Sequence, residues 1–391
     1  RGLEVRHYLR GTSTLVLWSK LRYSLCPLFA NEILVWYFDI TTRYRPRKII
    51  MSDNLVLDGE VREGFILLGK KGVYKVEKFL GEGSFGRVAK CKKLGTDKVV
   101  AIKIVSGSAQ TEINLLKELS KIDGDKHNLV KMVDCFRYKS YTCIAMELLD
   151  QSLYDFMRER YNQPLTVEEI KTIAWQMIVA LKGLESINLV HCDIKLDNIM
   201  LVDQVSEPFR VKLIDFGVSD KITNMRTGRL MQNMVYRAPE VHLGLPLDQR
   251  VDMWSLGYVL CVLYTGTFIH GWDSEYDIIR QSLKTEKSVS DRFDFWSFDQ
   301  LIPDHLEAAK KREVEQFVDL LKRMLMMDPS KRISPSEALR HPITHLRTPI
   351  ETPPPLLLTQ RSWVCFNSDT DCQVCTQKKK KKLVIVSMKL H

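Results

Sequence analysis

The hydrophobic pattern of the chain changes once, near residue 150, and this change restricts the fold more than any other feature. Residues 73–150 are mostly short β-type runs with one helical segment, whereas residues 151–345 are mostly helical. Strands grouped before helices, without internal repeats, are typical of the α+β class. The sequence therefore predicts a small β-rich lobe followed by a larger helical lobe.

Apolar spacing places the main elements within these lobes. Residues 74–80, 87–92 and 98–105 are β-type runs, and a glycine-containing turn between the last two predicts a hairpin. Apolar residues recur at helical spacing over residues 111–122 and again over residues 167–187. The second of these segments is long enough to be a core helix, and its apolar stripe is interpreted as packing surface.

The charge distribution argues against a nucleic-acid-binding body. The chain has 58 Lys and Arg against 48 Asp and Glu, a formal charge of +10. Residues 1–50 carry 9 basic and 3 acidic residues, residues 347–391 carry 8 and 3, and residues 51–346 carry 41 and 42. A nucleic-acid-binding domain has its basic excess on the folded part. We therefore expect no direct nucleic-acid binding, although the lysine run at residues 378–382 is either a nuclear address or a solvated charge run.

Cysteine usage and hydropathy indicate an intracellular protein, in the nucleus or the cytoplasm. The nine cysteines are odd in number and scattered, which suits a reducing compartment. Cys372 and Cys375 form a lone C-x-x-C, which is weak evidence for a metal or redox role. No apolar run reaches the ~18 residues of a membrane span. Residues 15–40 come nearest, but charged residues interrupt them and they lack the order of a signal peptide.

Both ends of the chain are expected to lie outside the folded domain. Residues 1–72 are interpreted as an N-terminal extension that is unstructured or in part foreign to the natural protein. Residues 346–391 contain three consecutive prolines and then the lysine run, so they are interpreted as a disordered basic tail.

The first chemical motif is a glycine-rich segment at residues 81–86, with Gly81, Gly83 and Gly86 in a G-x-G-x-x-G pattern. In a dinucleotide-binding fold these glycines would open a helix, but here residues 87–90 alternate and lead into a hairpin. Glycine suits a phosphate-covering loop because backbone amides can approach phosphate oxygens without an intervening Cβ. For this motif alone, an ordinary hairpin turn is an equal alternative.

A lysine follows inside an apolar strand, in Val100-Ala101-Ile102-Lys103. Burial of a lysine is costly unless the ammonium is paired. Glu112 lies nine residues on, in the first turn of the next expected helix, and can supply the carboxylate. Such a pair would hold the ammonium toward the α- and β-phosphates of a nucleotide. The alternative is a surface lysine that extends its ammonium into water.

The strongest chemical signal follows the long helix. In the segment that begins at His191, the residues Asp193, Lys195 and Asn198 can converge on one site from a single loop. Asp193 could accept a hydroxyl proton, Lys195 could neutralise a transferring phosphoryl group and Asn198 could bind a metal ion. Asp215-Phe216-Gly217 comes 22 residues after Asp193 and supplies the main carboxylate for Mg²⁺. Ala238-Pro239-Glu240 closes the segment.

In this order and spacing, the motifs resemble those of the eukaryotic protein kinases over residues 73–345, about 70% of the chain. The resemblance implies a bilobal kinase fold, with an N-lobe at residues 73–149 and a C-lobe at residues 150–345. The matching residues are Gly81, Gly83, Gly86, Lys103, Glu112, Asp193, Lys195, Asn198, Asp215 and Glu240.

The same resemblance implies further contacts. Glu240 would pair with Arg332, and Asp252 would anchor the catalytic loop from a buried helix. Met146 would be the gatekeeper before a hinge at residues 147–149. The residues expected to surround the adenine of ATP are Leu80, Val88, Ala101, Met146, Glu147, Leu149 and Met200.

Finer features resemble the homeodomain-interacting protein kinases, a subfamily of these enzymes. They include residues 151–156, 198–203 and 274–280, and also Cys192, because that subfamily lacks the usual arginine after the histidine. The missing arginine normally reads a phosphate on the activation loop. Its absence suggests activation that does not use it.

The activation segment departs from this subfamily. Leu230 stands where these kinases carry a tyrosine that they phosphorylate on themselves, and Met234 replaces the arginine that helps to read it. Asn233 replaces a Ser/Thr that usually braces the catalytic Asp and Lys. Activation by tyrosine autophosphorylation and a preference for proline after the target residue are therefore in question. Thr223 and Thr227 are other hydroxyls that could be phosphorylated in this loop.

Two functions are weighed on this basis. The first is a serine/threonine protein kinase, expected to be monomeric, that uses ATP and Mg²⁺ on protein substrates. Lys195 favours Ser/Thr over tyrosine specificity, and the subfamily suggests transcription regulators as partners. The second is a pseudokinase scaffold, whose marker would be the loss of Lys103, Asp193, Asn198 or Asp215. All four residues are present.

Overall fold

The computed structural model describes residues 60–83, 86–107, 109–268, 298–303 and 305–345, together with the backbone of three earlier strands. These strands are β1 (Leu21–Pro27), β2 (Ile33–Asp39) and β3 (Arg47–Met51), which pair antiparallel in the order β1-β2-β3. The expected basic tail at residues 346–391 lies outside the described residues.

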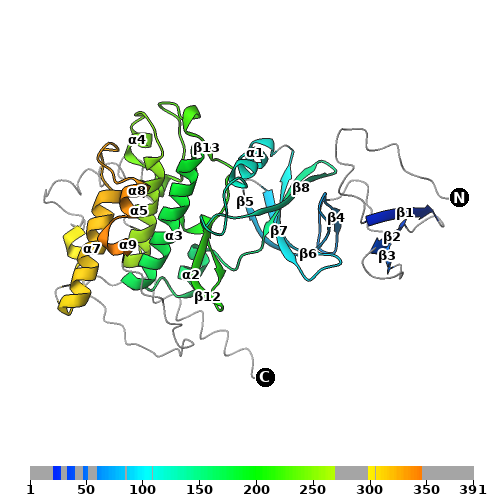
Figure 1. Ribbon diagram of the computed structural model, residues 1–391, viewed down its shortest axis with the longest axis horizontal. Coiled ribbons are helices and arrows are strands. Elements are labelled where there is room, and N and C mark those ends of the chain that lie inside the picture. The colour runs from blue at the N-terminus through cyan, green and yellow to red at the C-terminus, as the bar shows by residue number, and fades with distance from the viewer. Residues whose placement is uncertain are drawn as a thin grey trace, which may run out of the picture. The chain divides into compact units, whose positions relative to one another are not determined.

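The N-lobe is built on a six-stranded antiparallel sheet in the order β4-β5-β6-β7-β9-β8 (Figure 1). The predicted hairpin of residues 87–92 and 98–105 is confirmed as the pair β6 and β7. One helix, α1, follows β7 and ends at Leu119, three residues earlier than expected. The elements are β4 (Ile66–Leu68), β5 (Val73–Gly83), β6 (Gly86–Lys93), β7 (Val99–Ser106), α1 (Gln110–Leu119), β8 (Met132–Tyr138) and β9 (Tyr141–Glu147).

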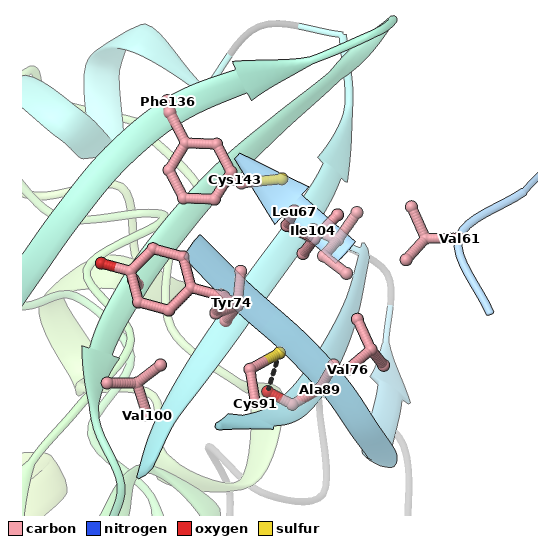
Figure 2. Close-up of a cluster of buried hydrophobic side chains, with 12 residues drawn as sticks. Val61, Leu67, Tyr74, Val76, Ala89, Cys91, Val100, Ile104, Phe136 and Cys143 are labelled. Carbon is pink, nitrogen blue, oxygen red and sulfur yellow. Dashed lines mark hydrogen bonds between the residues drawn. The ribbon is translucent and has the colours of Figure 1, made fainter. Parts of the chain in front are cut away.

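The two faces of this sheet have different side chains because residues alternate along a strand. On one face Val100, Ile102 and Ile104 of β7 are buried in a hydrophobic cluster, which Figure 2 shows. The rings of Tyr74 and Phe136 stack in the same cluster, with centroids 5.8 Å apart. The opposite face carries the residues between them, Ala101 and Lys103.

The sheet begins before residue 73, which differs from the unstructured extension expected for residues 1–72. Strand β4 pairs with β5, with Leu67 opposite Tyr74. Val61 and Leu67 are 1% and 0% exposed and belong to the hydrophobic cluster of the sheet. The physical reason is burial: the apolar run at residues 65–68 covers an edge of the sheet core, and sequence reasoning treated it as part of the extension.

The C-lobe is mainly helical, which confirms the α+β fold of two lobes. Its longest helix, α3, begins at a capping box in which Thr166 and Glu169 satisfy each other's backbone amides. The helices are α2 (Leu153–Glu159), α3 (Val167–Ser186), α4 (Pro239–His242), α5 (Arg250–Thr265), α7 (Ala308–Met324), α8 (Pro335–Ala338) and α9 (Pro342–His345). Two small sheets pair β10 (Leu189–Val190) with β13 (Asp220–Lys221), and β11 (Ile199–Asp203) with β12 (Glu207–Leu213).

Candidate active site

The structure brings Lys103 together with two carboxylates. Its ammonium donates to Glu112 Oε1 and to Asp215 Oδ1, each at 2.8 Å. Lys103 and Glu112 are 6% and 7% exposed, whereas the Asp215 side chain keeps 29% of its surface open. The lysine on β7, the glutamate on α1 and the aspartate after β12 therefore form one ion triad with a single accessible member.

The triad shifts the titration of its members in a consistent way. Burial alone would lower the pKa of Lys103, but Asp215 and Glu112 outweigh it and the pKa is raised. Burial would also raise the pKa of Asp215, but Lys103 and the amide of Gly217 hold it below its usual value. Burial raises the pKa of Glu112 against the opposing effect of Lys103. The ammonium and the Asp215 carboxylate are thus the members most firmly held in their charged forms.

Close packing requires glycine at two positions, one beside the triad and one in the sheet. A Cβ on Gly217 would lie 3.2 Å from Asp215 Oδ1 and 3.5 Å from Lys103 Nζ, so a side chain there would crowd the triad. A Cβ on Gly86 would lie 2.3 Å from the carbonyl oxygen of Ile104, and Gly86 has a φ of +124°. Gly86 is therefore required by the sheet itself, a reason that the sequence motif did not reveal.

The first two glycines of the motif have no such packing constraint. A Cβ on Gly81 or Gly83 would meet no atom of the described residues within 4 Å. Both glycines lie at the end of β5 and are exposed, while Ser84 and Phe85 lie outside the described residues. Open space around these backbone groups fits the expected approach of a phosphate.

Strand register places three of the expected adenine-binding residues on the same face of the sheet as Lys103. Val88 lies opposite Lys103, and Ala101 lies opposite Met146. Directly opposed residues share a face, as do residues two apart, so all four face away from the hydrophobic cluster. The expected hinge begins at Glu147, the last residue of β9. After the hinge, Ser152 forms an isolated antiparallel β-bridge with Met200, another residue expected at the adenine. Leu80 is 48% exposed and Leu149 is 8% exposed.

The catalytic loop holds Asp193 through its own neighbours. Lys195 Nζ donates to Asp193 Oδ2 at 2.7 Å, and Asn198 Nδ2 donates to the same oxygen at 3.0 Å. Asn198 Nδ2 also donates to the backbone oxygen of Asp193 at 2.8 Å. The three residues that the sequence predicted to converge are therefore in direct contact.

A buried carboxylate on α5 sets the path of this loop. Asp252 accepts the backbone amides of His191 and Cys192 at 2.6 and 3.0 Å. Cys192 adopts a φ of +67°, a costly conformation for a residue with a Cβ. His191 Nε2 lies 2.9 Å from the carbonyl oxygen of Ile214, while its Nδ1 lies 3.3 Å from the amide of Asp193. The neutral tautomer protonated on Nε2 satisfies both contacts.

A second buried ion pair lies deeper in the C-lobe. The guanidinium of Arg332 donates to both carboxylate oxygens of Glu240 at 2.6 and 2.8 Å. Their side chains are 0% and 1% exposed. Arg332 also donates to the carbonyl oxygens of Arg250 and Met326, so the charge is fully coordinated at the start of α4 and α5.

Sequence reasoning missed a third charged cluster, behind the hinge. Lys212 is 2% exposed, and its ammonium donates to Asp125 Oδ1 and Glu147 Oε1, each at 2.7 Å. Lys131 also binds Asp125 at 2.8 Å. Lys212 lies within an apolar strand, and this was the signal that pointed to Lys103. Applied at Lys212, the same reasoning would have predicted a buried acidic partner.

The activation segment runs from β13 to α4 and has Leu230 at the position where the sequence comparison expects a tyrosine. Leu230 is 69% exposed. Asn233 accepts the amide of Val235 at 3.2 Å, so it caps a short 3₁₀ turn. Gln232 ties the segment to α5, because its amide nitrogen donates to Val251 O at 2.9 Å and to Ser255 Oγ at 2.8 Å.

No group of three or more His, Cys, Asp or Glu side chains in the described part of the chain is arranged to hold a metal ion. This agrees with the way Mg²⁺ binds nucleotides, through one or two protein oxygens with phosphates and water completing the shell. Asp215 and Asn198 offer a carboxylate and a side-chain amide oxygen. The backbone amide of Ile214 donates to the backbone carbonyl oxygen of Asn198 at 2.9 Å, which brings the residue before Asp215 next to Asn198. The donor set fits Mg²⁺.

Comparison with known proteins identifies the family. The protein kinase domain family matches residues 74–344. The chain belongs to the protein kinase family.

The chain is also similar to the homeodomain-interacting protein kinases, which confirms the finer resemblance. It is 34% identical to homeodomain-interacting protein kinase 2 of Mus musculus over 344 residues, which cover 72% of this chain and 29% of that protein. It is 31% identical to homeodomain-interacting protein kinase 4 of Homo sapiens over 359 residues, which cover 74% and 58%. The chain thus spans little more than half, or less, of the length of these curated relatives.

Among the helices that the structure describes, none has the length and hydropathy needed to cross a bilayer.

Proposed function

We propose that this chain is an active serine/threonine protein kinase that uses ATP and Mg²⁺. The observation that carries the proposal is the ion triad of Lys103, Glu112 and Asp215, with each lysine contact at 2.8 Å. Kinase chemistry requires this lysine–glutamate pair and this aspartate to be in place together.

The reaction is an in-line displacement at phosphorus. The substrate hydroxyl oxygen forms a bond to the γ-phosphorus while the bond from that phosphorus to the bridging oxygen of ADP breaks. Lys195 and Asn198 both donate to Asp193 Oδ2, so we assign Oδ1 to the hydroxyl and its proton. Lys195 also offsets the charge of the transferring group, and Lys103 orients the α- and β-phosphates.

Asn198 and Asp215 are the residues that would hold Mg²⁺. When bound, this ion neutralises charge on the phosphate oxygens. Lys103 keeps Asp215 oriented and ionised, because it holds the pKa of that carboxyl below its usual value despite burial. Gly217 contributes a backbone amide to Asp215 Oδ1 at 3.2 Å.

The specificity for serine and threonine rests on Lys195. The lysine reaches Asp193 at 2.7 Å, the geometry in which it can contact both the base and the phosphoryl group. A pseudokinase scaffold is the second candidate, and Asn233 favours it, because the side chain caps its own turn where a bracing Ser/Thr is usual.

The test is transfer of labelled γ-phosphate by the purified full chain to a generic Ser/Thr-containing protein. The Asp193→Asn variant is measured alongside, and we expect it to lose about 10²–10⁴-fold in turnover because its amide is a poor proton acceptor. Its affinity for ATP should stay close to that of the wild type, since Asp193 lies on the phosphate-acceptor side. Phosphoamino-acid analysis of the product distinguishes serine and threonine from tyrosine.

Each outcome decides between the candidates. Equal turnover by wild type and Asp193→Asn would mean that the base is assigned wrongly. An absence of transfer by both, with ATP still raising the melting temperature, would favour the scaffold. Label on tyrosine alone would overturn the Ser/Thr assignment.

We further propose that the substrates include transcription regulators and that the protein acts in the nucleus. The support is the similarity to kinases named for their interaction with homeodomains. Co-localisation of the tagged full chain with chromatin, and labelling of homeodomain proteins by the wild type but not by Asp193→Asn, would test it. Exclusion of the tagged chain from nuclei would contradict it.

A further inference from the structure

The activation segment contains an ion pair of its own at the point where relatives place a phosphate. Arg229 Nη1 contacts Asp220 Oδ2, and Asp220 Oδ1 accepts the side chain of Asn224 at 2.7 Å and the amide of Lys221 at 2.8 Å. The Arg229 and Asp220 side chains are 33% and 25% exposed. Asp220 therefore has a hydrogen-bonded, partly buried carboxylate that pairs with a cation nine residues later, in the middle of the segment.

This ion pair is anchored next to the catalytic loop. Asp220 lies in β13 and is paired with Val190 of β10, one residue before His191. The side chain of Ser219 also donates to the carbonyl oxygen of His191 at 2.9 Å. A contact between Arg229 and Asp220 thus joins the middle of the activation segment to the strand that leads into Asp193.

An apolar cluster replaces the phosphate-reading arginine beneath this ion pair. Cys192 is buried and belongs to a cluster that includes Met231 and Trp254, with Val218, Ile222 and Met225 packed against it. Burial raises the pKa of the Cys192 thiol, so it is uncharged at neutral pH. An arginine here would need a phosphate to pair with, whereas the thiol packs against the segment directly.

We propose that Arg229 and Asp220, above the Cys192 cluster, are positioning residues that hold the activation segment in its ordered form without a phosphate. Phosphorylation generally orders such segments by giving an arginine an anionic partner. Here the anion is the carboxylate of Asp220, so both charges are encoded in the chain. The inference rests on the proposed kinase activity for its catalytic consequence, because an ordered segment is needed to bind the protein substrate.

The experiment uses the full chain treated with a phosphatase, with mass spectrometry to show that residues 218–240 are unmodified. Arg229→Met and Asp220→Asn are compared singly and together, and Arg226→Met is the matched control in the same segment. Arg226 is exposed and lies three residues before Arg229. Arg226→Met therefore makes the same substitution in the same segment but leaves the ion pair intact. Two readouts are taken: amide hydrogen exchange over residues 218–236, and KM for protein substrate and for ATP.

Dephosphorylated wild type is expected to retain full transfer activity. Arg229→Met and Asp220→Asn should each raise exchange and KM for the protein substrate by about threefold to tenfold, with KM for ATP within about twofold of wild type. The double variant should be no worse than either single one, since both remove the same contact. Arg226→Met should match the wild type in both readouts.

Three results would overturn the inference: loss of activity on dephosphorylation, equal exchange in Arg229→Met and Arg226→Met, or additive effects in the double variant. If the wild type transfers no phosphate in any state, the proposed kinase activity fails and the exchange comparison alone decides the inference. Higher exchange in Arg229→Met than in Arg226→Met would then still support an ion pair that orders the segment.

Discussion

Two buried ion assemblies in this chain have similar distances but very different surroundings. The Glu240–Arg332 pair is sealed, with side chains 1% and 0% exposed and the guanidinium coordinated by two further carbonyl oxygens. The triad of Lys103, Glu112 and Asp215 shares one ammonium between two carboxylates and leaves the Asp215 side chain 29% exposed. In the first assembly, every charged group has hydrogen-bond partners within the protein. In the second, the exposed oxygen surface of Asp215 can still bind a further group.

The difference distinguishes charged groups that stabilise the fold from charged groups that are available for the proposed reaction. A buried pair with full coordination contributes chiefly through the penalty of breaking it, because either partner alone would be a buried uncompensated charge. A triad with an accessible carboxylate has room for a further partner, which under the proposed function would be the metal ion of a nucleotide. The variants below test whether burial and accessibility divide the two roles in this way.

The largest effect on stability is expected at the sealed pair. Arg332→Met should lower the free energy of unfolding by about 3–5 kcal/mol, because it leaves the Glu240 carboxylate buried without a partner. The measurement is urea denaturation. Arg323→Met is the control, since its pair with Asp319 is 57% and 48% exposed and should contribute less than about 1 kcal/mol. Similar losses in both variants would contradict the structural role of the sealed pair.

At the triad, we expect a large loss of phosphoryl transfer and only a moderate loss of unfolding free energy. Lys103→Met should reduce phosphoryl transfer by about 10²–10³-fold, the usual cost of removing one preorganised electrostatic contact. Its unfolding free energy should fall by only about 1–3 kcal/mol, because Asp215 is 29% exposed and because burial already raises the pKa of Glu112, so that this carboxyl can take up a proton. Transfer assays and urea denaturation are run on the same samples, with the exposed Lys98→Met as control. A stability loss as large as that of Arg332→Met would remove the distinction.

Lys212 provides an intermediate case. Its ammonium is buried, but its partners Asp125 and Glu147 keep 57% and 21% of their side chains exposed. Lys212→Met should therefore cost about 1–3 kcal/mol of unfolding free energy, less than the sealed pair. Lys131→Met is the matched control, because it also removes a lysine bound to Asp125 but one whose side chain is 47% exposed. Equal losses would mean that burial of the cation is not what matters.

The smallest effect on unfolding free energy is expected for Asp125→Asn, at acidic pH. Hydrogen bonds from Lys131 and Lys212 hold the pKa of Asp125 at about 2, below its ordinary value of 3.8. A carboxyl group whose pKa is lower in the folded than in the unfolded state stabilises the fold at a pH above its unfolded-state pKa. This stabilisation is lost as the pH falls toward the folded-state pKa. Asp125→Asn should therefore flatten the fall in unfolding free energy between about pH 4 and pH 2, by less than about 1 kcal/mol because the group is half solvated.

Urea denaturation of wild type and Asp125→Asn across this acid range measures the change in slope. Asp97→Asn, an exposed carboxylate in the β6–β7 turn, is the control and should leave the slope as it is in the wild type. A flattening at neutral pH instead would show that the effect of Asp125→Asn is not one of protonation.

Sequence alone was enough for the fold, and it predicted most of the residues that the structure brings together at the candidate site. Lys103, Asp193 and Asp215 were chosen because a buried lysine needs a carboxylate and because phosphoryl transfer needs a base and a metal ligand. These requirements depend on residue type and local spacing, which the sequence contains directly. The boundary at residue 73 was less accurate, since the strand β4 is too short to have a distinctive period.

The partners of Lys212 and Arg229 were beyond local pattern reasoning. Lys212 binds Asp125 from 87 positions away, and Arg229 meets Asp220 across a loop with no regular period. The choice among many carboxylates depends on which strands pair and on how much water remains, and both follow from packing of the whole chain. Residue chemistry thus specified which charges the proposed reaction needs, whereas three-dimensional packing selected which charges are sealed, which stay open to water, and which pair within the activation segment.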